Sequence, residues 1–236
     1  MRLRTTLTTT LAVLAIGATG AVAADTADDN ANLLRGTRGA DLISGLAGGD
    51  TIFGNFGADT LRGDAGADFI SGGFGPDTLF GGTEDDQLNG GYGVDTLFGQ
   101  AGNDTLAGGP QADLLMGGSG DDRLLGGRGN DTIYAGPGTD LVLAGPGSDV
   151  IVARANDNQV DQIFCGQGDD TVYLRGEDKA DGSCEHVNVA AATDVEPADE
   201  ETPAARLAPV GDQASANDDD DEPRTVVIIR PGRRHR

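Results

Sequence analysis

The sequence has few of the large side chains from which an ordinary globular core is built. It contains no tryptophan, two methionines and 4% aromatic residues, against 39 glycines in 236 residues. Large aliphatic and aromatic side chains supply most of the apolar area that a thick protein interior buries. A thin, repetitive core suits this composition better, since each unit of a repeat protein packs only against its neighbours.

Positive charge and histidine are also scarce. Lys and Arg number 16 against 39 Asp and Glu, a formal net charge of −23, and the two histidines are His186 and His235. Nucleic acid is not expected as a partner, because binding to a phosphate backbone requires a cationic surface. A zinc centre is not expected either, because it needs four clustered ligands, mostly Cys or His.

The signatures of common catalytic sites are absent from the sequence. It contains no HExxH segment, no GxSxG elbow and no GxGxxG loop. Carboxylates are plentiful, but a carboxylate that holds a metal ion is a poor general acid or base. The chain is therefore predicted not to be an enzyme.

A long apolar run occurs only at the N-terminus. Arg2 and Arg4 precede an apolar stretch at residues 11–23, which ends in Ala-Val-Ala. This is the pattern of a secretory signal peptide with an A-x-A cleavage site, and the run is shorter than the roughly 20 residues of a membrane-spanning helix. We expect residues 1–23 to be a signal peptide and the mature chain to be secreted and extracellular, with no integral membrane segment. An uncleaved N-terminal anchor is the alternative.

What the sequence does contain is a nine-residue repeat that continues without insertion or deletion from Gly36 to Val152. Thirteen units follow one another and are numbered here in chain order. Position six is always Asp, position eight is always Ile, Leu or Val, and positions one and four are each Gly in eleven units. Ala135 and Ala144 replace the glycine at position one, and Glu84 and Gln111 replace it at position four.

This pattern resembles the repeat-in-toxin (RTX) family, whose hemolysin-type calcium-binding repeat reads GGxGxDxUx, with U a large aliphatic residue. The resemblance covers about half of the chain. It implies an all-β fold, a right-handed parallel β-roll in which two nonapeptides complete one coil and odd and even units line opposite edges. Within each unit, we expect a six-residue turn followed by a three-residue strand, with position eight inward and positions seven and nine outward.

The resemblance also implies calcium sites between the turns of successive coils, built from the position-six aspartates and backbone carbonyls. Thirteen units give eleven pairs on the same edge, so about ten ions are expected, with Glu84 and Gln111 as departures from the pattern. The predicted ligands are Asp41, Asp50, Asp59, Asp68, Asp77, Asp86, Asp95, Asp104, Asp113, Asp122, Asp131, Asp140, Asp149 and Asp170. Without the ion, rows of carboxylates repel one another, so we expect calcium to fold the chain. The alternative, that the aspartates only occupy turns, would allow Asn or Ser at position six, and neither occurs.

The repeat becomes irregular at its C-terminal end. After a slip of three residues it resumes with Asp161 and then Asp170 at position six. We predict residues 153–189 to be two degenerate units and a cap. The two cysteines, Cys165 and Cys184, lie in this segment, and a disulfide between them is expected in an exported chain, with two free thiols as the alternative.

Polar segments flank the repeat on both sides. Residues 24–35 are predicted to be a lead-in that covers the first coil, because terminal repeats need such a cover. Residues 190–236 are rich in Ala, Pro, Asp and Glu and are predicted to be disordered. Their basic end could pair with the roll, touch an anionic cell surface or stay solvated.

Position nine of the later odd units carries large apolar residues at intervals of eighteen: Phe80, Phe98, Met116 and Tyr134. An exposed apolar strip can mark a binding surface, although stacking, the cap or the tail could also cover it. Two functions therefore stay open. One is a free-standing calcium-binding module; the other is a calcium-dependent adhesin that binds another protein or the cell surface through this strip.

Overall fold

The computed structural model describes residues 30–153, 159–175 and 178–190, and the regular elements in these ranges are all β-strands. The predicted signal peptide and the predicted disordered tail from residue 191 onward lie outside the described residues. Within the described ranges there is no helix long and apolar enough to cross a membrane.

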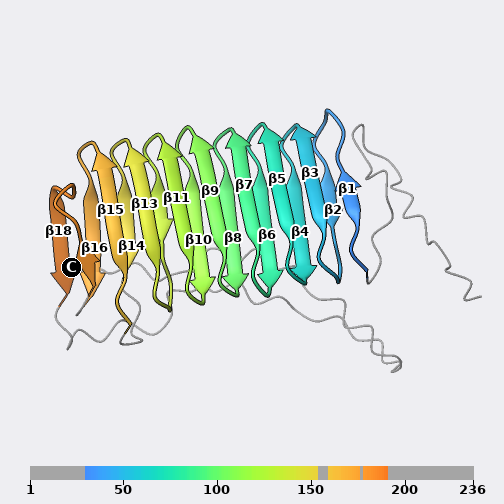
Figure 1. Cartoon of the computed structure of the whole chain (residues 1–236). Coiled ribbons are helices and arrows are strands. Elements are labelled where there is room, and N and C mark those ends of the chain that lie inside the picture. The colour runs from blue at the N-terminus through green and yellow to red at the C-terminus, as the bar shows by residue number, and fades with distance from the viewer. Residues whose placement is uncertain (1–29, 154–158, 176–177, 191–236) are drawn as a thin grey trace, which may run out of the picture. The chain divides into compact units, whose positions relative to one another are not determined.

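The strands alternate along the chain between two parallel sheets (Figure 1). The first sheet consists of β1 (Leu33–Arg35), β3 (Thr51–Phe56), β5 (Phe69–Phe74), β7 (Gln87–Tyr92), β9 (Thr105–Pro110), β11 (Arg123–Arg128), β13 (Leu141–Pro146), β15 (Gln162–Gln167) and β17 (Lys179–Ala180). The second sheet consists of β2 (Leu42–Ser44), β4 (Thr60–Ala65), β6 (Thr78–Thr83), β8 (Thr96–Ala101), β10 (Leu114–Ser119), β12 (Thr132–Tyr134), β14 (Val150–Ala153), β16 (Thr171–Arg175) and β18 (His186–Ala190).

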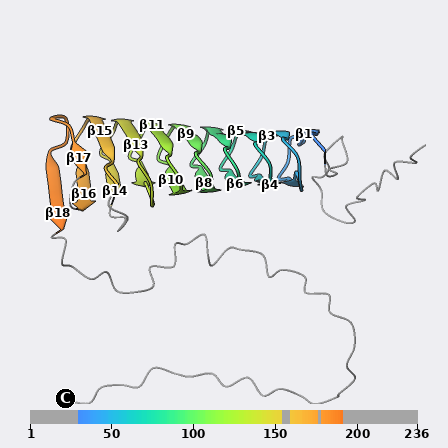
Figure 2. The same cartoon turned by 60° about the horizontal axis from the view of Figure 1, so that its bottom comes forward.

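Each strand pairs with the strand two further along, so two nonapeptides complete one coil. Leu79 of β6, for example, lies opposite Leu97 of β8, and Leu97 lies opposite Leu115 of β10. Figure 2 shows the two sheets as facing layers joined by the turns at both edges. The predicted parallel β-roll is thereby confirmed.

The core is a file of aliphatic side chains between the two sheets, as the repeat predicts. Every position-eight residue is buried, and Leu79, Leu97 and Leu115 are fully so. Strand side chains alternate in direction, which turns position eight inward and positions seven and nine outward. Leu34 of β1 begins this file ahead of the first unit, because it pairs with Ile52 and is itself fully buried.

The strands are longer and the turns shorter than predicted. Most strands have six residues, made of positions seven to nine of one unit and positions one to three of the next, as in β6. The chain bends at position two, where Gly82 has φ 133°, yet Gly82 still pairs with Gln100 of the next coil. Only positions four to six are left for the turn, because the parallel ladder continues across the bend.

The apolar strip of the later odd units lies on the second sheet and is stacked and mostly buried, which agrees with the stacking alternative and not with an exposed binding surface. Phe80, Phe98 and Met116 are only 4%, 2% and 5% exposed, and Tyr134 is partly buried. The rings of Phe80 and Phe98 stack with their centroids 4.9 Å apart, and the Arg62 guanidinium lies 4.2 Å from the Phe80 centroid. Neighbouring side chains therefore cover the ring faces and leave little of this strip for a partner.

The C-terminal strands continue both sheets with a changed register. Leu141 of β13 pairs with Gln162 of β15, twenty-one residues later, which accommodates the slip of three residues. A disulfide joins Cys165 of β15 to Cys184, whose Cα atoms lie 5.2 Å apart. The predicted disulfide is thus confirmed.

Candidate metal centre

The position-six aspartates are buried, although each lies in a turn at the edge of the roll. All thirteen are 1–5% exposed, and Asp161 and Asp170 are 3% and 0% exposed. Apart from Asp50 and Asp161, none of them forms an ion pair with a Lys or Arg of the described residues. Buried carboxylates are normally neutralised, paired or bound to a metal. The charge of these two rows is therefore directed into the turns.

One oxygen of each carboxylate forms part of a ladder along the edge. Oδ1 of Asp59 accepts a hydrogen bond of 2.8 Å from the backbone N–H of Asp41, eighteen residues earlier. The same bond recurs from coil to coil: odd units form one ladder, on the odd edge, and even units form the other, on the even edge. Each aspartate thus fastens its coil to the preceding one.

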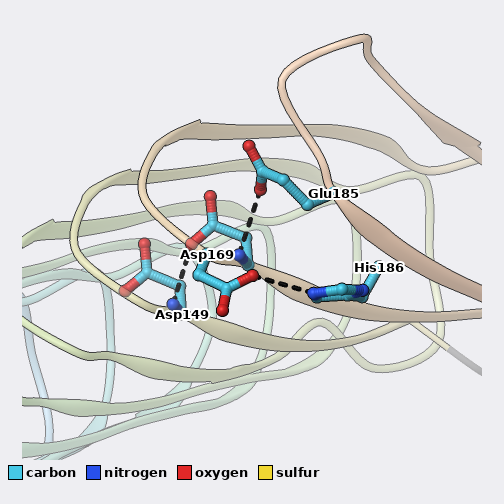
Figure 3. Close-up of polar contacts among 5 residues, drawn as sticks. Asp149, Asp169, Glu185 and His186 are labelled. Atoms are coloured by element: carbon cyan, nitrogen blue, oxygen red, sulfur yellow. Dashed lines mark hydrogen bonds and ion pairs between the residues drawn. The ribbon is translucent and has the colours of Figure 1, made fainter.

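Each ladder ends at a carboxylate of the C-terminal cap. The repeat pattern did not predict that these two residues take part. On the odd edge, Asp149 N–H donates to Asp170, and Glu185 Oε2 then accepts the Asp170 N–H at 3.0 Å (Figure 3). On the even edge, Asp178 Oδ1 accepts the N–H of Asp161 at 3.2 Å. The repeat could not identify these residues, because they lie fifteen and seventeen residues after their donors in place of eighteen.

The second carboxylate oxygen is left over by this arrangement. From the third unit onward, Oδ2 is buried and accepts no hydrogen bond in Asp59, Asp68, Asp77, Asp86, Asp95, Asp104, Asp113, Asp122, Asp131, Asp140, Asp149 and Asp170. Asp41 differs, since its Oδ2 accepts the backbone N–H of Thr37 at 2.6 Å. A buried oxygen without a donor is costly, and a bound cation would satisfy it.

Burial raises the pKa of the position-six carboxyl groups from Asp59 to Asp149. Desolvation is the largest cause; a backbone hydrogen bond lowers the pKa, and in most of them neighbouring carboxylates raise it further. The pKa rises to about 6 for Asp68, Asp104, Asp131 and Asp149, to about 7 for Asp77, Asp86, Asp113 and Asp122, and to about 8 for Asp140. The rows therefore resist ionisation unless positive charge is supplied.

In units 3 to 11, the left-over oxygen faces a backbone carbonyl across the glycine at position one. A β-carbon on Gly54 would lie 2.4 Å from Asp59 Oδ2 and 2.6 Å from the carbonyl oxygen of Gly72. The two oxygens therefore lie within about 5 Å of each other, a gap that one calcium ion can span with bonds of about 2.3 to 2.6 Å. The pairing repeats in the following units, for example with Asp77 Oδ2 and the Gly90 carbonyl.

The donor set favours a hard cation. Among residues 30–153, 159–175 and 178–190, no three carboxylate, imidazole or thiol groups converge on one point. A cation in the turns must therefore take most of its ligands from backbone carbonyls, which calcium accepts in shells of six to eight oxygens. Soft metals that need Cys or His ligands do not fit this site.

The two exceptions at position four keep the geometry of the turn. Glu84 and Gln111 adopt the positive φ of the glycines they replace, at 72° and 84°. Their side chains accept the N–H groups of Gly66 and Gly93, one coil earlier, at 2.8 and 2.9 Å. The turn is therefore preserved at both positions.

A family model described as the RTX calcium-binding nonapeptide repeat matches the chain in four copies, at residues 26–61, 44–79, 80–115 and 116–151. Together these matches span more than half of the sequence. The chain belongs to the RTX repeat family. RTX repeats bind calcium, and the buried oxygens of the two edges are ligands of the kind that calcium takes. A comparison with curated protein sequences found no match.

Proposed function

We propose that this chain is a secreted calcium-binding protein whose β-roll folds around ions held between successive turns of each edge. The observation that supports it best is the row of buried Oδ2 atoms that lack a donor and face backbone carbonyls. In this proposal, each ion takes a position-six aspartate of one coil and carbonyls of the same and the next coil. About ten ions follow if nearly every same-edge pair of units holds one.

The chain's own residues prepare the site. The N–H of Asp77 holds Oδ1 of Asp95, which fixes the orientation of the carboxylate and leaves Oδ2 for the ion. Calcium supplies the positive charge that allows the buried carboxylates to ionise. Without it, desolvation and repulsion oppose folding, so binding and folding are coupled.

Secretion fits this chemistry. RTX proteins are commonly secreted, and the basic and apolar start of the sequence has the form of a signal peptide. A disulfide between Cys165 and Cys184 suits an oxidising compartment outside the cytosol. A chain that folds only with calcium would stay unfolded until it reaches a calcium-rich medium.

A calcium titration followed by far-ultraviolet circular dichroism, with calorimetry for the stoichiometry, tests the proposal. We expect most of the β-sheet signal to appear with calcium and to be lost with chelator. Magnesium is the control and should be far less effective, because it requires tighter octahedral geometry. A β-sheet signal that is unchanged by chelator, together with no heat of calcium binding, would contradict the proposal.

A second candidate function is retention on an anionic cell envelope, and one exposed row favours it. On the odd edge, Phe56, Phe74 and Tyr92 are 49%, 50% and 57% exposed. Their rings stack with centroids 5.1 and 5.0 Å apart. The exposed carboxylates of residues 30–153 all lie on the other edge: Asp64, Glu84, Asp85 and Asp121.

The charges at the ends of this row argue for an anionic partner. Arg38 and Arg128 occupy the same position of their odd units and are exposed. Cell fractionation with and without calcium tests the idea, using the Phe74→Ser/Tyr92→Ser variant. Calcium-dependent retention that this variant loses, while it keeps the circular dichroism of the parent, would support the second function. Release of the parent protein into the medium would oppose it.

A further inference from the structure

The residue at position one changes along the roll. It is glycine in units 1 to 11, whereas units 12 and 13 begin with Ala135 and Ala144, and the last degenerate unit begins with Cys165. We propose that this residue decides whether the aspartate of its unit takes a calcium ion, so that the sites end with Asp131. The inference rests on the proposed function and limits where that function operates.

The glycine units show why a side chain at this point interferes with binding. A β-carbon on Gly117 would lie 2.4 Å from both Asp122 Oδ2 and the carbonyl oxygen of Ala135. On Gly126 it would lie 2.5 Å from Asp131 Oδ2 and 2.6 Å from the next carbonyl. Contacts below 3.0 Å force one of the two atoms to move, and a carbonyl of the backbone cannot move as easily as the end of a flexible side chain. Glycine alone lets the two oxygens approach one small space.

By the geometry of the glycine units, the buried methyl group of Ala135 would lie in this space in unit 12, beside the carboxylate of Asp140. A carbon atom between the two oxygens supplies no ligand and would keep them apart, which removes the close pair that a cation needs. The same reasoning applies to Ala144 beside Asp149 and to the β-carbon of Cys165 beside Asp170.

The core changes at the same point of the chain. Up to unit 11, the hydrophobic core consists of position-eight residues and their equivalent in β1 alone. From unit 12 onward, a second file joins it at position one: Ala135, Ala144, Ala153, Cys165 and Leu174, all of them buried. In the final coils, a buried apolar side chain thus occupies position one, where the earlier coils have glycine and a space beside the carboxylate.

The final coils also have stabilising contacts that the others lack. The disulfide from Cys165 to Cys184 ties β15 to the chain before β18. Asp178 and Glu185 close the two ladders with carboxylates from the cap. These contacts need no ion, so the C-terminal coils act as a calcium-independent end on which the calcium-dependent coils assemble.

The test restores glycine in the full chain. In the Ala135→Gly/Ala144→Gly variant, calorimetry should show about two more calcium ions than in the parent, one for each restored unit. Ala107→Gly is the matched control, since Ala107 lies at position nine of an outward strand face and should leave the stoichiometry unchanged. The reverse variant, Gly117→Ala/Gly126→Ala, should bind about two fewer ions.

Hydrogen exchange of the parent protein gives a readout that needs no variant. In chelator, the amides of β13, β15 and β16 should exchange more slowly than those of β4 to β10. Equal stoichiometry of the parent and the Ala135→Gly/Ala144→Gly variant, or equal exchange along the roll in chelator, would overturn the inference. Both results are distinct from failure of the proposed function, in which the parent protein itself would bind no calcium.

Discussion

The Oδ1 atom of Asp95 accepts a 2.8 Å hydrogen bond from the backbone N–H of Asp77, while Oδ2 of the same carboxylate is buried without a donor. One side chain therefore does two separate things. Oδ1 fixes the register of two coils, and Oδ2 offers a ligand in the turn. Substitutions that affect only one of these oxygens can separate the two roles.

Replacing Asp95 by Asn should weaken calcium binding while the ladder persists. The amide oxygen can still accept the Asp77 N–H, but an NH₂ group takes the place of Oδ2 and the charge is lost. We expect a loss of about one ion in calorimetry and a higher calcium concentration at the folding midpoint. Asp121→Asn is the control, because the Asp121 side chain is exposed and accepts the backbone N–H of Thr139, a bond that the amide oxygen of Asn can keep. Unchanged stoichiometry in Asp95→Asn would count against Oδ2 as a ligand.

The core file should account for much of the stability of the folded roll. Leu97 is fully buried, and its replacement by Ala leaves a cavity in a core that is one residue deep in each coil. The expected loss in the free energy of unfolding is about 2 to 5 kcal/mol in saturating calcium. Leu42→Ala is the matched control, since Leu42 is 78% exposed, and it should change stability by less than about 0.5 kcal/mol. If urea denaturation gave the two variants the same loss in the free energy of unfolding, the position-eight side chains would not be the main source of core stability.

The sequence predicted the features of this fold that follow from a fixed period. Leu97 belongs to the core because position eight always points inward, and Asp95 meets Asp77 because two units make one coil. The burial of Phe98 could not be predicted in this way. It lies on the outward side of its strand, and its burial depends on the identities of its neighbours in other coils, such as Phe80.

The same limit explains what was missed at the candidate site. Glu185 ends a ladder from a segment whose spacing departs from the repeat, so no periodic signal marked it. The left-over oxygens could be identified only from the structure, because the sequence does not tell which oxygen of each carboxylate accepts a backbone hydrogen bond. Position one was visible as a change from Gly to Ala, but its meaning depends on the carbonyl that faces it.

Reducing the disulfide should destabilise the C-terminal end of the roll. The bond between Cys165 and Cys184 closes a loop of about 20 residues, which contributes about 3 kcal/mol in the chain-entropy account. We expect the Cys165→Ser/Cys184→Ser variant to lose stability of this order in calcium and to show faster amide exchange in β15 and β16. The calcium stoichiometry should stay that of the parent. A variant as stable as the parent would show that the other contacts of the cap suffice.

Calcium-free protein should gain structure as the pH falls. In the folded state, burial raises the pKa of both Asp77 and Asp122 to about 7, above the ordinary value of 3.8. Between these values, the folded chain binds more protons than the unfolded chain, so its stability falls as the pH rises from about 4 to 7. Circular dichroism in chelator should therefore show more β-sheet at pH 5 than at pH 8.

Saturating calcium should reverse this dependence. Protons and calcium compete for the same carboxylates, so acid weakens binding and the calcium-bound roll should be more stable at pH 8 than at pH 5. Urea denaturation at both pH values, with calcium and with chelator, measures the two slopes. Slopes of equal sign would contradict the assignment, because they would mean that the groups responsible for the pH dependence are not the ones that meet the ion.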